Sequence, residues 1–119
     1  MSTPLTGYLG NVLGGNDTYP LKMIDPVQRI AKAVITITRN NGYDGVITVE
    51  GRARGSSQGY QPTPYQNNIS GAQNAVATLT SAASEHSITV DVSAQDIALV
   101  VSGQSTGTAT VDVAMAEQA

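Results

Sequence analysis

Apolar and polar residues alternate with a period of two along residues 31–39, which read AKAVITITR. Every second residue from Ala33 to Ile37 is apolar and would share one face of an extended chain, as in a strand with one buried face. Residues 40–45, NNGYDG, then supply a turn rich in Asn and Gly, and the same alternation resumes over residues 45–52, GVITVEGR. This pattern predicts a β-hairpin made of the two segments.

Short runs of apolar and β-branched residues recur through the rest of the chain, separated by Ser, Gly, Asn and Gln. They are residues 75–82 (AVATLTSA), 86–93 (HSITVDVS), 96–104 (DIALVVSGQ) and 106–115 (TGTATVDVAM). Six short strands without an amphipathic helical stretch predict an all-β fold, an antiparallel sandwich or barrel. The residues expected to face its core are Ile35, Ile37, Ile47, Val49, Ile88, Val90, Leu99, Val101, Val111 and Val113.

The first thirty residues have no sustained period and are rich in Gly and Pro. So long an irregular segment is uncommon inside a compact domain, so we interpret residues 1–30 as an extended N-terminal arm and 31–119 as the sandwich domain. The arm is too apolar for a solvated tail, and we expect it to lie along its own sandwich or a neighbouring subunit. Its candidate partner-binding residues are Tyr8, Leu9, Val12, Leu13, Tyr19, Leu21, Met23 and Ile24. Within it, Asp25 before Pro26 suits the N-cap of a single helical turn.

Composition and charge limit the classes of function. The chain has 119 residues, which fits one domain, and it has no Cys. The absence of Cys excludes a disulfide framework, thiolate metal ligands and a Cys nucleophile. All six Lys and Arg lie between positions 22 and 54, whereas only Asp and Glu supply charge after Ser70. This separation of basic and acidic residues along the chain either orients identical subunits head to tail, or it reflects solvated charges of both signs that become interspersed on the surface when the chain folds.

The overall balance is acidic, with a net charge of −3 and an isoelectric point near 4.7. Neutralising nucleic-acid phosphates needs a concentrated basic face, so nucleic acid is not expected as a partner. The chain has no apolar run long enough to span a bilayer, and its first residues lack the pattern of a secretory signal. We therefore expect a soluble protein with no membrane partner that is not exported by a signal peptide.

Residues that could carry catalysis or bind metal are few. His86 is the only histidine, and no nucleophile elbow accompanies it, so we interpret it as a surface residue rather than part of a triad. Asp91, Asp96 and Asp112 lack the closely alternating oxygen ligands of a calcium loop and are expected to be solvated. Residues 13–17, LGGND, do not form a phosphate loop because no Lys follows them. We expect no catalytic residue, no metal and no cofactor, and therefore no enzyme.

Residues 51–68, GRARGSSQGYQPTPYQNN, form the most distinctive stretch of the chain. They follow the second predicted strand, where a sandwich has to cross to its other sheet, and we interpret them mainly as a corner of the fold. The two prolines of QPTPY favour extended backbone, and Tyr60 and Tyr65 can anchor the segment by burying their rings. The alternative is that the two tyrosines are exposed on a flat face and stack on a sugar ring, as in a carbohydrate-binding module.

The succession VITITRNNGYDGVITVEGRARGSSQGYQPTPYQN, followed by SITVDVS and SGQSTGTATVDVAM, resembles a β-sandwich domain of virion proteins of tailed bacteriophages. That pattern has a G-x-V-x-V-E-G strand, a Ser/Gly loop, an aromatic residue leading into x-P-x-P-Y, and a last strand ending in G-T-A-T-V. The resemblance covers about residues 33–115. Tyr60 stands where the pattern has Trp.

The resemblance implies a jelly-roll-like, non-enzymatic accessory protein of the phage particle, such as a decoration or cementing protein. Its partners would be the major capsid protein and copies of itself, in a symmetric homo-oligomer such as a trimer, although composition does not fix the number. It would be made in the host cytoplasm and reside on the capsid surface, with the arm as the contact to capsid or neighbour. The alternative is a carbohydrate- or receptor-binding module of a tail or fibre, using Tyr60 and Tyr65.

Overall fold

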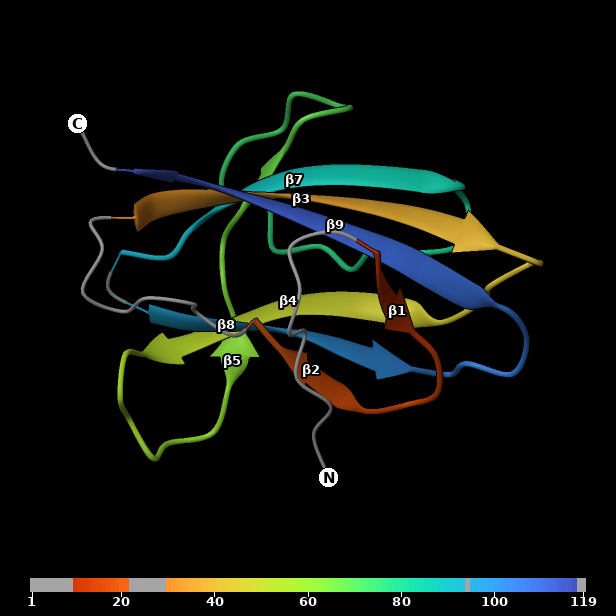
Figure 1. Cartoon of the computed structure of the whole chain (residues 1–119), viewed down its shortest axis with the longest axis horizontal. Coiled ribbons are helices and arrows are strands. Elements are labelled where there is room, and N and C mark those ends of the chain that lie inside the picture. The colour runs from red at the N-terminus through yellow and green to blue at the C-terminus, as the bar shows by residue number, and fades with distance from the viewer. Residues whose placement is uncertain (1–9, 22–29, 94, 118–119) are drawn as a thin grey trace.

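The computed structural model describes residues 10–21, 30–93 and 95–117. Two antiparallel sheets pack face to face as a β-sandwich, and the described residues contain no helix (Figure 1). The strands are β1 (Asn11–Leu13), β2 (Thr18–Pro20), β3 (Ile30–Asn40), β4 (Val46–Ala53), β5 (Gln61–Pro62), β6 (Gln66–Asn67), β7 (Glu85–Asp91), β8 (Gln95–Ser102) and β9 (Thr108–Glu117). The all-β sandwich expected from the sequence is confirmed.

The strand order makes the sandwich a jelly roll. One sheet has the order β1-β9-β3-β7-β6, and the other has the order β2-β8-β4-β5. The pairs β1·β9, β2·β8, β3·β7 and β4·β5 are nested, as if one long hairpin with its tip between β4 and β5 had been rolled up. Consecutive strands lie in opposite layers except for β4 and β5, which share the four-stranded sheet, and β6 and β7, which share the five-stranded one. This is the connectivity of a double-sheet jelly roll.

The predicted hairpin of residues 31–39 and 45–52 is wrong, because β3 and β4 lie in different sheets. β3 pairs with β7 and β9, while β4 pairs with β8 and β5. The connection between β3 and β4 crosses from one layer to the other and places Tyr43 in the core, almost fully buried. Alternation shows which face of a strand is apolar, but two such strands can bury their faces across a sandwich as well as side by side.

The segment 75–82 is also not the strand that was expected. Ala75 and Leu79 each form an isolated bridge, to Tyr65 and Ile47 respectively, and the residues between them are exposed. Leu79 is the buried residue of the segment. The buried Leu79 side chain is enough to hold an irregular loop in place. The residues two positions on either side of it, Ala77 and Ser81, are exposed, so the segment lacks the buried face of a strand.

The core is the part of the fold that the sequence pattern predicted best. All ten residues expected to face inward are at most 4% exposed. They come from both sheets, and the paired positions Ile35↔Ile88 and Val49↔Leu99 place apolar side chains next to each other within each layer. The prediction of the buried faces is therefore confirmed for all five strands that supply them.

Part of the predicted N-terminal arm belongs to the sandwich. β1 and β2 are edge strands, one in each sheet, and Leu13, Tyr19 and Leu21 are buried in the common core. These three side chains are therefore not a free partner-binding surface, which corrects the interpretation of residues 10–21. The sequence pattern did not show these strands because three residues are too few for an apolar–polar period to appear. Residues 1–9 and 22–29, which include Tyr8, Leu9, Met23, Ile24 and the expected helical turn at Asp25, lie outside the described residues.

Candidate functional site

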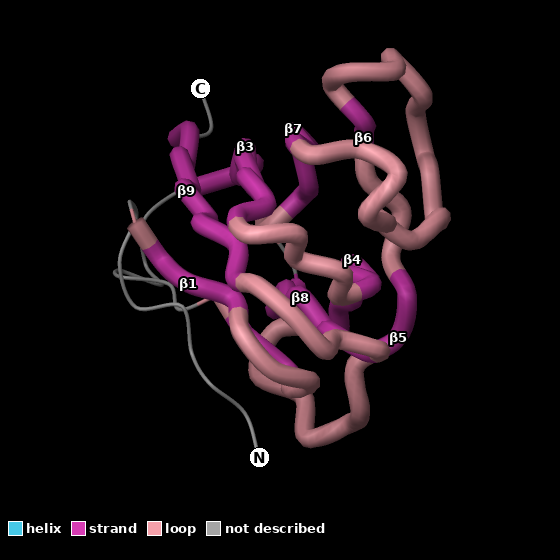
Figure 2. The backbone as a smooth tube through the Cα atoms, turned by 90° about the vertical axis from the view of Figure 1, so that its right-hand side faces the viewer, coloured by secondary structure: helices cyan, strands magenta, loops and turns pink. Residues whose placement is uncertain are grey.

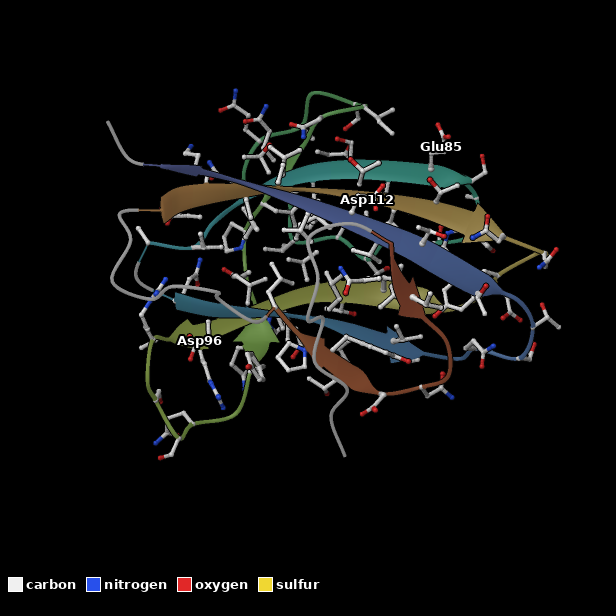
Figure 3. The ribbon with its side chains drawn as sticks, in the orientation of Figure 1. Glu85, Asp96 and Asp112 are labelled. Atoms are coloured by element: carbon white, nitrogen blue, oxygen red, sulfur yellow. The ribbon has the colours of Figure 1, made fainter. Side chains whose placement is uncertain are left out.

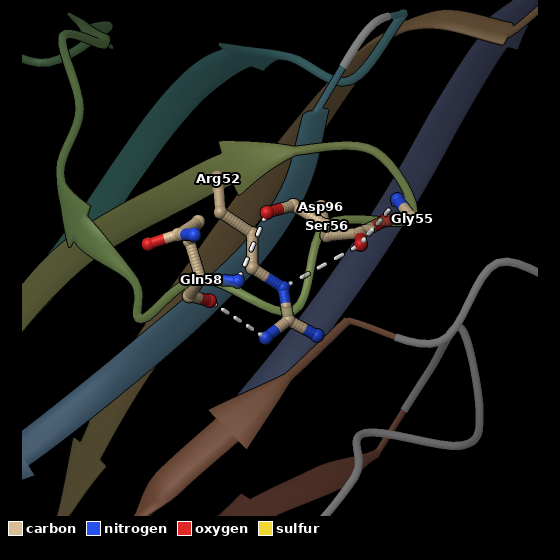
Figure 4. Close-up of polar contacts among 5 residues, drawn as sticks. All are labelled: Arg52, Gly55, Ser56, Gln58 and Asp96. Carbon is tan, nitrogen blue, oxygen red and sulfur yellow. Dashed lines mark hydrogen bonds and ion pairs between the residues drawn. The ribbon is translucent and has the colours of Figure 1, made fainter.

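The loop that follows β4 is held by its own polar contacts. The Arg52 guanidinium donates a hydrogen bond from Nη1 to the carbonyl oxygen of Gln58 at 3.1 Å, and its Nε lies 3.7 Å from Oδ2 of Asp96 (Figure 4). The same carboxylate accepts a hydrogen bond from the Gly55 amide at 3.2 Å. Arg52 also lies over the Tyr60 ring, 4.3 Å from its centroid. These contacts make the loop a closed corner, as the sequence suggested.

The chain crosses between the sheets just after this corner, also as expected. β5 belongs to the four-stranded sheet and β6 to the five-stranded one, so the crossing falls at Thr63–Tyr65. Tyr65 is 4% exposed, and its hydroxyl donates a hydrogen bond to the Ala77 carbonyl oxygen at 2.6 Å. Burial raises the pKa of this phenol. Tyr65 is thus an anchor, and since Arg52 lies against Tyr60, the two tyrosines do not form a shared exposed platform for a sugar.

Residues 68–84, the projecting loop, are the largest irregular part of the described chain. Figure 2 shows part of this loop standing out beyond β6, away from the two sheets. Two large apolar side chains on it are exposed, Ile69 at 64% and Val76 at 58%. No charged residue occurs between Arg54 and Glu85. An exposed, charge-free loop that carries aliphatic side chains has the composition of a contact surface.

Three backbone hydrogen bonds hold the base of this loop. The Tyr65 and Ala75 backbones exchange hydrogen bonds of 2.9 and 2.8 Å, and the Asn67 amide donates to the Ala72 carbonyl oxygen at 2.8 Å. Asn74 adopts a positive φ of 56°, a conformation that Asn tolerates better than most residues. The loop is therefore a small, internally paired unit rather than an unsupported tail.

The structure also reveals a buried polar cluster that the sequence analysis missed. His86 is 6% exposed, so its interpretation as a surface residue is wrong. Arg39 donates from Nε to His86 Nε2 at 2.9 Å, and its other nitrogens donate to the carbonyl oxygens of Tyr43, Gly45 and Leu79 at 3.1, 2.7 and 3.0 Å. The guanidinium thereby joins β3, β7 and two loops at one end of the sandwich.

This environment keeps His86 neutral. Burial, followed by the nearby positive charge of Arg39, lowers the pKa of His86 to about 4. Because Nε2 accepts the hydrogen bond from Arg39, the remaining ring proton belongs on Nδ1. Burial likewise raises the pKa of Tyr43 to about 12, and its hydroxyl donates to the Gly14 carbonyl oxygen at 2.8 Å. His86 and Tyr43 thus serve as structural ties between strands and loops.

The carboxylates that were considered for calcium lie apart. Figure 3 places Asp112 on the upper sheet and Asp96 on the lower one. Asp112 accepts a hydrogen bond from the Gly10 amide at 2.7 Å, and Asp91 accepts two from Ser93. Among the residues that the structure describes, no three His, Cys, Asp or Glu side chains are grouped so that they could hold a metal ion.

Comparisons with known proteins do not identify a family. No protein-family model, curated protein or solved structure matches this chain. Within the described residues, no helix is long and apolar enough to cross a membrane.

Proposed function

We propose that this protein is a structural component of a tailed-bacteriophage particle, a decoration protein on the capsid surface. It binds the major capsid protein and neighbouring copies of itself, and it carries no enzymatic activity. It is made in the host cytoplasm and joins the particle there. Support comes from the resemblance in sequence pattern and, at the level of analogy alone, from the jelly-roll fold, which viral capsid domains and lectins share.

The observation that carries this proposal is the charge-free projecting loop with exposed Ile69 and Val76. Burying a charge in an interface is costly unless it is paired, so the centres of protein interfaces are depleted in charge. A loop of small, amide and aliphatic side chains avoids that cost. The loop also stands on a rigid sandwich, so that docking needs little ordering of the described backbone.

The described part of the predicted arm offers less binding surface than the sequence suggested. Leu13, Tyr19 and Leu21 are buried in the protein's own core, whereas Val12 on β1 is 56% exposed. Val12 is therefore the described residue through which the original arm interpretation can still be tested. The alternative function, carbohydrate or receptor binding through Tyr60 and Tyr65, is not proposed on those residues because Tyr65 is buried.

The test is co-sedimentation of the purified protein with empty bacteriophage capsids assembled without it, together with light scattering of the free protein. We expect saturable capsid binding that is lost in the Ile69→Asp/Val76→Asp double variant, because the interface would have to bury two carboxylates. Ser102→Asp is the matched control, since Ser102 is exposed at the end of β8 and belongs to neither the loop nor the arm.

Val12→Asp separates the two surfaces. If Val12→Asp abolishes capsid binding and the loop variant does not, the edge strand is the contact and the loop assignment is wrong. If the wild-type protein neither binds capsids nor self-associates, the decoration function itself is wrong. Near-identical circular dichroism spectra of all variants would exclude misfolding as the cause, and the exposure of the changed residues makes this outcome the expected one.

A further inference from the structure

A polar pocket of about 250 Å³ lies at the base of the projecting loop. Lys32 of β3 and Asp91 of β7 form its floor on the outer face of the five-stranded sheet, and Gln66 of β6 stands beside them. The rest of its lining comes from Gln73 and Asn74 of the loop and from Pro64, Tyr65 and Thr89. The pocket is smaller than the roughly 300–1,000 Å³ typical of sites for drug-sized ligands, so it suits a ligand of about one ring.

The polar groups of this pocket are largely free to accept a ligand. The side chains of Gln66, Gln73 and Asn74 make no hydrogen bond with any described residue. Asp91 uses Oδ1 for both hydrogen bonds from Ser93, at 2.8 and 2.7 Å, which leaves Oδ2 without a donor among the described residues. Three amides and one carboxylate oxygen thus present both donors and acceptors within one small space.

The charges of the pocket balance. Lys32 and Asp91 are directly opposite each other in the pairing of β3 and β7. They are nevertheless not in close contact, because the one ion pair within 4.0 Å that the described residues form is Arg52–Asp96. The Lys32 ammonium and the Asp91 carboxylate lie near each other without forming an ion pair, and their opposite charges cancel. The pocket therefore has no net charge that would attract a free ion. The ammonium and the carboxylate can instead hydrogen-bond to neighbouring groups of an uncharged ligand.

We infer that this pocket binds a neutral, hydroxyl-rich ligand, namely a single sugar unit, through Asp91, Lys32 and the amides of Gln66, Gln73 and Asn74. Each sugar hydroxyl both donates and accepts, so a vicinal pair matches an amide or a carboxylate beside an ammonium. Pro64, which is exposed and lines the same pocket, offers an apolar ring for the C–H side of the sugar. Tyr65 also lines the pocket but is 4% exposed, and Tyr60 does not line it, so the proposed site does not rest on stacking by the two tyrosines. It does not depend on capsid binding.

The test is a titration of the full chain, labelled with ¹⁵N, with D-glucose, D-galactose and N-acetyl-D-glucosamine, followed by amide chemical shifts. We expect at least one sugar to bind with a Kd on the order of 1 mM, in the weak range of small-ligand affinities. The shifted amide signals should be those of residues 65–66, 73–74 and 89–91. Gln66→Ala and Gln73→Ala should each weaken binding at least tenfold, because each removes an amide that hydrogen-bonds to the sugar. Neither change should disturb the fold, since these side chains make no hydrogen bond with any described residue.

Thr36→Ala is the matched control, since Thr36 is exposed on the same outer sheet face, outside the pocket, and this variant should bind as the wild type does. Three results would overturn the inference. One is the absence of saturable shifts with all three sugars. Another is binding that survives both Gln variants, which would place the site elsewhere. The third is a preference for glycine over every sugar, which would mean that the Lys32 and Asp91 charges select a zwitterion. The dispersion of the amide spectrum verifies that each variant is folded.

Discussion

Acid should destabilise this protein through His86, well above the pH at which its carboxylates titrate. In the folded state the imidazole is buried and accepts a hydrogen bond from Arg39 Nε at 2.9 Å. Protonation would break that bond and place two positive charges side by side. The perturbation is therefore a shift from pH 7 to pH 4, compared between the wild type and His86→Gln, whose side-chain oxygen can still accept the hydrogen bond from Arg39.

The magnitude follows from the pKa of His86, which is lowered from 6.5 to about 4 on folding. The unfolded chain therefore takes up the proton first as the pH falls. The stabilisation from the neutral imidazole is complete above pH 6.5, declines between pH 6.5 and 4, and is lost below pH 4. At about 1.4 kcal/mol per pKa unit, the full loss in the free energy of unfolding is on the order of 3 kcal/mol.

The assay is urea unfolding followed by circular dichroism at pH 7, 6, 5 and 4. His86→Gln should show a much flatter profile between pH 6.5 and 4. Hydrogen bonds from Ser105 and Thr106 lower the pKa of Asp44 to about 2, so its contribution is lost only below pH 3.8, outside this window. Burial raises the pKa of Glu50, which acts in the opposite direction. Equal slopes for the wild type and His86→Gln would refute the reasoning.

Three further predictions concern stability and are measured by the same urea unfolding at pH 7. Ile37→Ala and Leu99→Ala should each cost about 2–5 kcal/mol, and a cost within error of zero would contradict their burial. Tyr19→Ala should cost about 3–5 kcal/mol if β2 belongs to the core, whereas a docked arm would predict almost no loss in the monomer. Gly107→Ala should cost about 3 kcal/mol or more, because its Cβ would lie 2.5 Å from the Asn40 carbonyl oxygen at a φ of +76°. Gly103→Ala, at a φ of +66° with open space around it, should cost only about 1–2 kcal/mol, and equal losses in the two Gly variants would refute the steric argument.

The alternation of apolar and polar residues predicts which side chains are buried, because each strand of a sandwich has one face toward the core and one toward water. Ile35 and Ile88, for example, are both inward in their own strands, whichever strands lie beside them. Alternation carries no information on lateral partners, so it could not separate a β3–β4 hairpin from the jelly roll. The short edge strands were missed for a related reason, since three residues around Val12 or Tyr19 show no period.

The Arg39–His86 cluster, by contrast, had a signal in the sequence. Arg39 follows Ala33, Ile35 and Ile37 at the same spacing of two, and His86 precedes Ile88 and Val90 in the same way. Both therefore occupy inward positions, and the pairing Ile37↔His86 places the imidazole one step from the Arg39 side chain. Residue type alone predicts that an arginine or a histidine is exposed to solvent. Here the positions of Arg39 and His86 in the alternating pattern were the better guide to the side of the sheet on which they lie.

The pocket and the projecting loop lay beyond prediction because no local pattern specifies them. Lys32 and Asp91 line one pocket only because β3 and β7 are paired, and Gln73 lines it only because the Tyr65–Ala75 bridge folds the loop back. Each of these contacts depends on a non-local pairing, whereas the charge-free composition of the same segment was visible from the start. The rigid layers are thus specified by the spacing of apolar residues. The surfaces proposed for binding lie where that spacing ends, so variants of exposed loop residues are expected to alter binding without altering the fold.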